Sequence, residues 1–342
     1  MLSLAAIVPQ LNHPSFSFAR SDFSGAKLAA SPQLINTGLS QYKRKACGKL
    51  QVSASSKKIL IMGGTRFIGI FLSRLLVKEG HQVTLFTRGK APIAQQLPGE
   101  SDSDFADFCS KILHLKGDRT DYDFVRRSIS AEGLDIVYDI NGREAVEVEP
   151  VLDALPNLEQ YIYCSSAGVY LKTDYLPHYE TDGVDLKSRH KGKLETERLL
   201  QSRSSVNWTV IRPVYIYGPL NYNPIEEWFF HRLKAARPIP IPNSGMQVTQ
   251  LGHVKAGGFP EPDIIHYNPK EFDFGKKKAF PFRDQHFFAS IEKAKSLLEW
   301  KPEFGLFEGL TNSYNLDFGL GTFRKEADFS TDDLILGNSL FR

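Results

Sequence analysis

Apolar and polar residues follow one another in short blocks over most of the chain, and these blocks predict strands that alternate with helices. Ile59–Met62 and Val83–Phe86 are short apolar runs rich in β-branched residues, which is typical of buried strands. Between them, apolar side chains recur at helical spacing from Phe67 to Leu76, as on a helix with one buried face. The stretch Lys57–Arg88 therefore predicts a βαβ unit.

The same alternation continues toward the carboxyl end. Further predicted elements are, by type, a polar loop over Gln95–Phe108, strands over Ile112–Leu115, Ile136–Ile140 and Gln160–Cys164, and helices over Glu144–Leu155 and Ile225–Ala235. Strands and helices in such an order form a doubly wound parallel sheet. We therefore expect an α/β fold with a Rossmann-type domain over residues 55–220 and a smaller carboxy-terminal region over residues 221–342.

The first strand-to-helix turn is rich in glycine, with Gly63, Gly64 and Gly69. Glycines at such a turn let the backbone approach a pyrophosphate, which the free N–H groups of the helix N-terminus attract. Arg66 lies inside the turn, where its side chain either crowds the pyrophosphate or pairs with a phosphate. Arg88 follows the second strand, where NAD-selective sites carry an acid, so it favours NADP unless it is only a solvated loop residue. These five residues are the predicted cofactor-binding set.

Charge is distributed unevenly along the chain. Met1–Ala54 holds eight serines and six basic residues but a single acid, Asp22, which is typical of an organelle transit peptide. A disordered tail is the alternative. The whole chain has a formal net charge of +3, so the part after this segment is slightly acidic, and any binding of nucleic acid must use a local basic patch. No apolar run reaches the length of a membrane span, and the three cysteines suggest neither a disulfide framework nor a zinc site.

Two later motifs resemble the extended short-chain dehydrogenase/reductase family, as the glycine-rich turn does. In the run SSAGVY, Ser166 falls on the catalytic serine of that family, and Lys193 falls on its catalytic lysine. The family's tyrosine stands four residues before the lysine, where this chain has Arg189. A guanidinium stays protonated and cannot exchange a proton with a substrate, and the neighbouring His190 points about 100° away on a helix. The resemblance therefore marks these four residues as candidate catalytic positions while it disfavours hydride transfer.

Cations gather at two places in the sequence. The first group is Lys187, Arg189, Lys191 and Lys193, with Arg189 and Lys193 expected on one helix face. The second group mixes cations with aromatic residues, which together can neutralise phosphates and stack bases: Lys276, Lys277, Lys278, Phe280, Phe282, Arg283, Phe287 and Phe288. Both groups are predicted to bind RNA. The alternatives are a solvated charged face for the first group and core phenylalanines with a solvated rim for the second.

Several longer segments together resemble the chloroplast stem-loop-binding proteins of plants. They are GGTRFIG, YCSSAGVY, SRHKGKLETE, RPVYIYGP, EEWFFHRLKA and KKKAFPFRDQHFF. The resemblance implies a plastid protein of the stroma, nucleoid or plastoglobules that binds stem-loop transcripts and ribosomal RNA. It also implies Mg²⁺-aided endoribonuclease activity, a close paralogue and ribosomal particles as partners, and roles in RNA stability, rRNA processing, transcription and translation. The alternatives are an NADP-dependent oxidoreductase or sugar-nucleotide epimerase and a non-catalytic scaffold that protects RNA. No metal ligands can be named.

One part of the short-chain dehydrogenase pattern is missing. The segment LGHV at 251–254 resembles the family's HVxD segment, which precedes a helix, a strand and another helix. Here Lys255 runs directly into Ala256 and two glycines, and the resemblance resumes only at Glu292–Trp300. We infer an internal deletion at Lys255–Ala256, so the carboxy-terminal region is expected to be incomplete and loosely packed.

Overall fold

The computed structural model describes residues 7–9, 56–93, 96–249, 262–283, 285–322 and 326–339. The central sheet and its helices come from these elements: β2 (Lys58–Met62), α1 (Ile68–Lys78), β3 (Gln82–Thr87), α2 (Asp102–Lys111), β4 (Ile112–Lys116), α3 (Tyr122–Ser130), β5 (Ile136–Asp139), α4 (Ala145–Ala154), β6 (Gln160–Cys164), α5 (Lys191–Ser202) and β7 (Trp208–Ile211). The predicted strands are confirmed, each within one residue of the expected ends.

The sheet has the order β4-β3-β2-β5-β6-β7, and all six strands run parallel. This order confirms the predicted doubly wound sheet. Met62 pairs with Phe86 on one side and with Asp139 on the other, so the carboxyl ends of β2, β3 and β5 lie level with one another. An additional strand, β1 (Ile7–Pro9), runs antiparallel to β7 at the edge of the sheet. The transit peptide over Met1–Ala54 stays a prediction.

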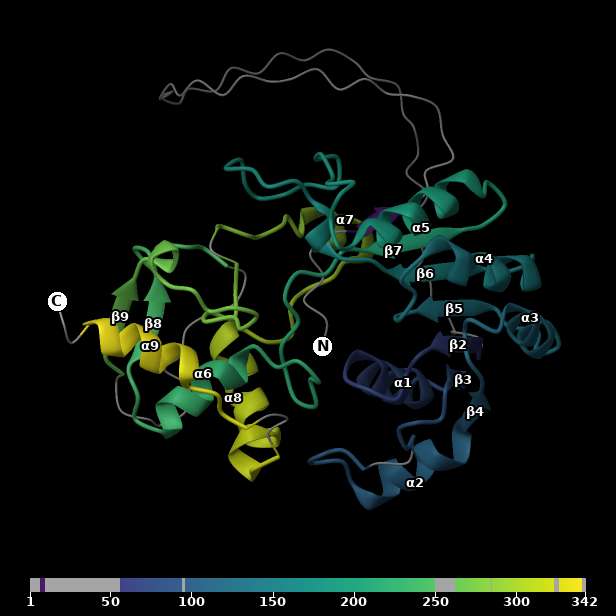
Figure 1. Cartoon of the computed structure of the whole chain (residues 1–342). Coiled ribbons are helices and arrows are strands. Elements are labelled where there is room, and N and C mark those ends of the chain that lie inside the picture. The colour runs from purple at the N-terminus through teal and green to yellow at the C-terminus, as the bar shows by residue number, and fades with distance from the viewer. Residues whose placement is uncertain are drawn as a thin grey trace, which may run out of the picture. The chain divides into compact units, whose positions relative to one another are not determined.

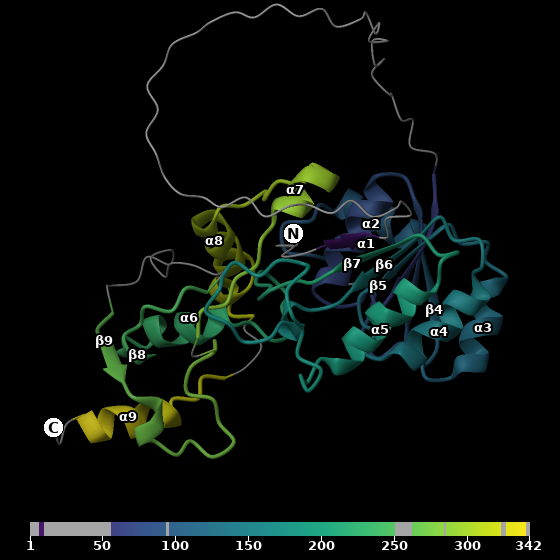
Figure 2. The ribbon, with the colours of Figure 1, turned by 90° about the horizontal axis from the view of Figure 1, so that it is seen from above.

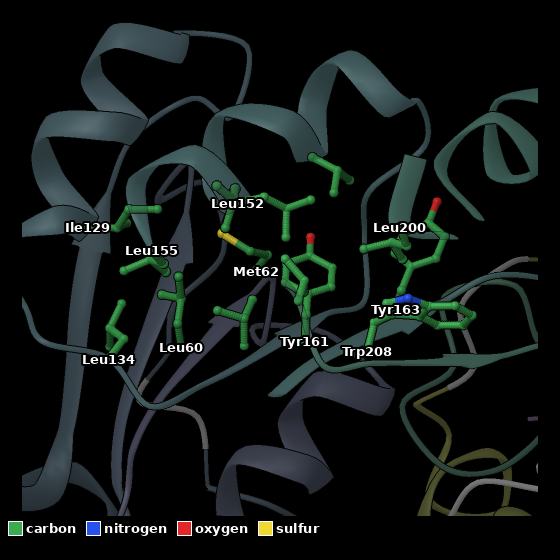
Figure 3. Packing of buried hydrophobic residues seen from close by; sticks show 14 of the residues in the cluster. Leu60, Met62, Ile129, Leu134, Leu152, Leu155, Tyr161, Tyr163, Leu200 and Trp208 are labelled. Atoms are coloured by element: carbon green, nitrogen blue, oxygen red, sulfur yellow. The ribbon is translucent and has the colours of Figure 1, made fainter. Parts of the chain in front are cut away.

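Alternate residues of β2 enter two separate apolar clusters, one on each face of the sheet. Leu60 and Met62 belong to the cluster that α3, α4 and α5 cover, and Ile59 and Ile61 belong to the cluster under α1 and α2. Figure 2 shows these two groups of helices on opposite sides of the sheet. Figure 3 shows the first cluster, in which the helix residues reach down onto the sheet residues Leu60 and Met62. Since both faces are covered, the strands read as continuous apolar runs in the sequence.

The stretch predicted as a polar loop, Gln95–Phe108, contains most of helix α2 instead. Ser101 caps this helix by accepting a hydrogen bond from the backbone N–H of Asp104 at 3.1 Å. Phe108 is buried, and the guanidinium of Arg74 lies 3.6 Å from the centre of its ring. Serine followed three residues later by an acid is a known helix-start signal. The loop prediction was wrong because it followed polarity and not this capping pattern.

The carboxy-terminal region consists of short elements after residue 220. They are α6 (Glu226–Lys234), β8 (Ile239–Pro242), β9 (Ile264–Tyr267), α7 (Glu292–Leu298), α8 (Leu306–Leu316) and α9 (Ser330–Ser339) (Figure 1). β8 and β9 form a separate two-stranded parallel sheet. A buried ion pair of 2.6 Å joins Arg232 of α6 to Asp332 of α9. The domain boundary at residue 220 stays a prediction, and the Lys255–Ala256 junction lies outside the described residues.

Among the helices that the structure describes, none has the length and apolar character that a bilayer crossing requires.

Candidate functional site

A cavity of about 510 Å³ lies at the carboxyl ends of the central strands. Of the five predicted cofactor-binding residues, Gly63, Gly64, Arg66 and Arg88 line it. Gly63 and Gly64 have φ values of 117° and 100°, which residues with a side chain rarely adopt. Gly69 stands behind the cavity wall, where a Cβ atom would collide with the backbone of Gly64. The turn therefore needs its glycines both for its conformation and for close packing, and it leaves room for a phosphate at the start of α1.

A buried ion pair closes the inner wall of this cavity. Both oxygens of Asp139 accept hydrogen bonds from Arg119, at 3.0 and 2.9 Å, and one also accepts from the Tyr161 hydroxyl at 2.8 Å. Burial alone would raise the pKa of Asp139, but the charge and hydrogen bonds of Arg119 outweigh it and hold this pKa below its usual value. Arg119 thus lines the cavity as a fixed cation. This pair could not be predicted from the sequence, because Asp139 ends β5 whereas Arg119 follows β4, and only the fold brings the two residues together.

The backbone of Gly142, which follows strand β5, connects the cavity to Lys193. The backbone N–H of Gly142 donates to Asp139 at 2.7 Å, and its carbonyl accepts from Lys193 at 2.8 Å and from Tyr163 at 3.0 Å. Lys193 donates also to the carbonyl of Cys164 at 2.6 Å. Burial lowers the pKa of Lys193. Its ammonium is thus held against backbone carbonyls inside the protein.

Arg189 and Lys193 do not share a helix face, which corrects the sequence prediction. Helix α5 begins at Lys191 with His190 as its N-cap, so Arg189 lies in the turn before the helix. The Ser188 hydroxyl holds this turn by donating to the carbonyl of Gly168 at 3.0 Å. The helical periodicity was extended one turn too far, and it therefore placed an exposed and a part-buried cation side by side.

His190 and Arg189 lie together above the SSAGVY turn. Nε of Arg189 donates to Nε2 of His190 at 3.1 Å. A Cβ atom on Gly168 would lie 2.7 Å from the His190 ring and 3.1 Å from Oγ of Ser166, so the ring packs closely on this turn. Ser166 itself accepts a hydrogen bond from the backbone N–H of Gly168 at 3.0 Å. The candidate catalytic residues are therefore neighbours.

Arg283 joins this group from a distant part of the chain. Burial lowers the pKa of His190, and the positive charges of Arg189, Lys193 and Arg283 lower it further. The Arg283 guanidinium is fixed by stacking 4.2 Å from the centre of the Phe287 ring. Phe287 in turn packs with Ala167 and Tyr170 of the SSAGVY turn, so the structure brings members of both predicted RNA-binding groups to this turn. We call Arg189, His190 and Arg283 the cationic site.

The other predicted RNA-binding lysines lie elsewhere. Lys187 is exposed in the turn before α5, and Lys191 is exposed at the first position of that helix. Lys276, Lys277 and Lys278 are exposed in the loop before Ala279, where Lys277 forms an ion pair of 2.9 Å with Asp328, just before α9.

The phenylalanines of the second group pack against other rings. Phe280 lies 5.6 Å from Trp228, and Phe282 lies 5.3 Å from Tyr215, both measured between ring centres. Phe287 is buried. These contacts support the alternative interpretation, in which the phenylalanines of this stretch are core residues.

Metal ligands were left open by the sequence. Within the described residues, no group of three or more histidine, cysteine or acidic side chains is placed to hold a metal ion. None of the described residues is therefore assigned as a ligand of the Mg²⁺ that the resemblance implies.

Comparison with known proteins shows which family and which solved structures this chain resembles. Residues 59–256 match the model of the NAD dependent epimerase/dehydratase family. The structure resembles UDP-glucose 4-epimerase of Thermotoga maritima, with a TM-score of 0.58, 17% identity and coverage of 78% of this chain and 100% of that one. It also resembles WbmH of Bordetella bronchiseptica in complex with NAD⁺, with a TM-score of 0.56, 15% identity and coverage of 80% and 100%. At these identities the likeness shows the fold.

A curated relative is far more similar in sequence. The chloroplast stem-loop binding protein of 41 kDa b from Arabidopsis thaliana is 69% identical over 377 residues, which span 97% of each chain. The aligned length exceeds the 342 residues of this chain, so the relative contains residues that have no counterpart here. The chain belongs to the NAD dependent epimerase/dehydratase family, and within it to the chloroplast stem-loop-binding proteins.

Proposed function

We propose that this chain is a chloroplast RNA-binding protein that recognises stem-loop transcripts through the cationic site. The observation that carries the proposal is Arg189, which donates to His190 at 3.1 Å and stands where the oxidoreductases that this chain resembles have their tyrosine. A second guanidinium, Arg283, stacks on Phe287, which packs with Ala167 and Tyr170 of the neighbouring SSAGVY turn. Two guanidinium groups there suit the oxygens of a phosphodiester, and neither can act as the proton shuttle of hydride transfer. The name of the Arabidopsis relative supports the same function.

Cleavage of RNA would require a bound divalent ion in addition to the cationic site. Mg²⁺-aided hydrolysis needs oxygen ligands for the ion, and the described residues do not supply a cluster of them. We therefore assign cleavage to no residue. Ribosomal RNA, ribosomal particles and a close paralogue remain proposed partners, because the resemblance implies them and the structure supplies no contact that tests them.

Substitution of Arg189 tests the RNA-binding site. Arg189→Tyr should weaken binding of an RNA hairpin about tenfold near 0.1 M salt and reduce the slope of log K against log salt by about one, because one phosphate contact is lost. Arg189→Lys should retain more affinity, since it keeps the charge. The measurement is fluorescence anisotropy with the purified chain over a range of salt. Arg198→Ala, which removes an exposed arginine further along α5, is the matched control. If Arg189→Tyr and the parent bind the hairpin with equal affinity at every salt concentration, RNA does not bind at the cationic site.

We also propose that the cavity holds NADP in preference to NAD. The turn at Gly63 and Gly64 fits a pyrophosphate, and Arg88 and Lys90 line the cavity beyond it. Their charges also help to lower the pKa of Asp118, after the larger effect of its hydrogen bonds from Thr120. The reduced dinucleotide would supply a hydride to a substrate, but Arg189 stands where the tyrosine that exchanges the accompanying proton is expected, so the proposed role of the dinucleotide is to occupy and order the site.

Arg88→Ala tests the cofactor preference. A charge-assisted hydrogen bond to the 2′-phosphate is worth about 1.5–3 kcal/mol. The substitution should therefore weaken the binding of NADP about 10- to 100-fold and leave the binding of NAD unchanged. Isothermal titration calorimetry with both dinucleotides measures this, with Arg127→Ala on α3 as a control for a general loss of exposed charge. If the parent binds NAD and NADP equally, Arg88 does not contact a 2′-phosphate.

A further inference from the structure

The loop between β6 and α5 presents the most exposed aromatic residue of the described chain. Tyr175 is 88% exposed and Tyr179 is 49% exposed. This connection is drawn in teal in Figure 1. The rings that the sequence suggested for base stacking, Phe280 and Phe282, are instead in contact with other aromatic rings. The two tyrosines therefore offer free ring faces that the phenylalanines do not.

The loop is fixed at its base, so these rings stand on an ordered support. The backbone N–H of Leu171 donates to the carbonyl of Gly183 at 3.0 Å, which closes the loop upon itself. The N–H of His178 donates to the carbonyl of Phe288 at 3.0 Å, which ties the loop to a distant segment. The His178 ring is buried and stacks on Tyr170, with 4.7 Å between the ring centres. The backbone that carries the two tyrosines therefore needs little further ordering when a ligand binds.

The same support leads directly to the cationic site. Asp185, near the end of the loop, donates through its backbone N–H to the carbonyl of Val169 at 2.8 Å, and the turn that carries Arg189 follows. Arg283 connects the two places. Its guanidinium stacks on the Phe287 ring, and the centre of that ring lies 6.0 Å from the centre of the His178 ring at the loop base. Phe287 also packs with Ala167 and Tyr170 of the turn on which the His190 ring lies.

We propose that Tyr175 and Tyr179 form a stacking site for unpaired nucleobases, next to the phosphate-binding cations of the cationic site. The inference rests on the proposed RNA-binding function and specifies which part of an RNA the protein reads. Unpaired bases expose their faces to aromatic side chains, whereas paired bases are stacked within the helix. Phosphate contacts at Arg189 and Arg283 hold the strand, and stacking on the tyrosines then favours RNA that has a single-stranded loop.

The test compares a hairpin RNA with a fully paired duplex of the same stem sequence. Tyr175→Ala should weaken hairpin binding about 5- to 100-fold, which is the usual effect of losing one stacking contact. Its salt slope should stay unchanged because no cation is removed, and binding of the duplex should also stay unchanged. Tyr175→Trp should retain hairpin affinity. The fluorescence of a 2-aminopurine base in the hairpin loop should be quenched when the parent chain or Tyr175→Trp binds. It should be quenched less when Tyr175→Ala binds.

Phe307→Ala is the matched control, since it removes an aromatic ring that is 61% exposed on α8. The inference is overturned if Tyr175→Ala and Tyr179→Ala both bind the hairpin as the parent does while Arg189→Tyr weakens it. The inference is also overturned if the tyrosine variants lose affinity for the hairpin and for the duplex by the same factor. A parent chain that binds neither RNA overturns the proposed function together with this inference.

Discussion

Replacing Glu197 with alanine is expected to lower the free energy of unfolding by about 3–5 kcal/mol. Glu197 of α5 and Arg212, just after β7, form an ion pair in which both side chains are almost completely buried. Arg212 donates to the two carboxylate oxygens at 3.1 and 2.5 Å, and Ser165 donates to one of them at 2.5 Å. Truncating the acid leaves the guanidinium buried without its counter-charge, which costs far more than the pair itself contributes.

The measurement is equilibrium unfolding in urea, followed by circular dichroism. Glu195→Ala is the matched control, because this acid lies on the same helix but is exposed. This substitution should change the free energy of unfolding by no more than about 0.5 kcal/mol. A domain of ordinary stability has about 5–15 kcal/mol in total, so Glu197→Ala should be among the most damaging single substitutions in this chain. A loss no larger than that of Glu195→Ala would mean that water reaches Arg212 and replaces the carboxylate.

The fold could be predicted from the sequence because both faces of the sheet are covered. A strand buried on both faces needs apolar residues at every position, so β2 and β3 appear as continuous short runs that local reading finds easily. Helix ends were harder to predict, since they depend on capping contacts more than on hydrophobic spacing. That difference explains why α2 was missed and why α5 was started before Lys191.

The site was predictable only in parts. The glycines at 63 and 64 could be found because a tight turn leaves a local pattern of residue types. The meeting of Arg189 and Arg283 at the SSAGVY turn could not, since it depends on two segments that only the tertiary fold brings together. The pair of Arg119 and Asp139 was missed for the same reason. The exposed Tyr175 was overlooked because exposure is a property of the folded loop and not of its sequence.

Apolar residues around α7 and α8 are exposed in the way that the inferred internal deletion would leave them. Five large apolar side chains within one short stretch are between 37% and 61% exposed: Leu297, Leu298, Phe304, Leu306 and Phe307. Single exposed apolar residues are normal on a protein surface, but a cluster of this kind indicates a surface that another segment covers. The Arabidopsis relative has residues without a counterpart here, and the family match ends at Ala256, beside the inferred junction. These observations together favour a missing covering segment.

Restoring that segment should therefore stabilise the carboxy-terminal region. The change is insertion, at the inferred junction between Lys255 and Ala256, of the segment that the Arabidopsis relative carries between its counterparts of these two residues. Covering five half-exposed side chains should raise the free energy of unfolding by about 4–7 kcal/mol, since full burial of each contributes about 1.5–3 kcal/mol. Urea unfolding and limited proteolysis measure the effect. In the 342-residue chain, cuts should fall after Asn221 and leave an amino-terminal fragment, and the restored chain should resist them.

An insert of equal length made of glycine and serine is the control for loop length alone. It cannot bury the apolar stretch, so it should leave the cuts and the unfolding transition as they are in the parent chain. If the parent already unfolds in one cooperative transition and resists cleavage as well as the restored chain does, the junction is a natural loop. The apolar residues from Leu297 to Phe307 would then be a surface that this chain carries without a covering segment, and the inferred deletion would be wrong.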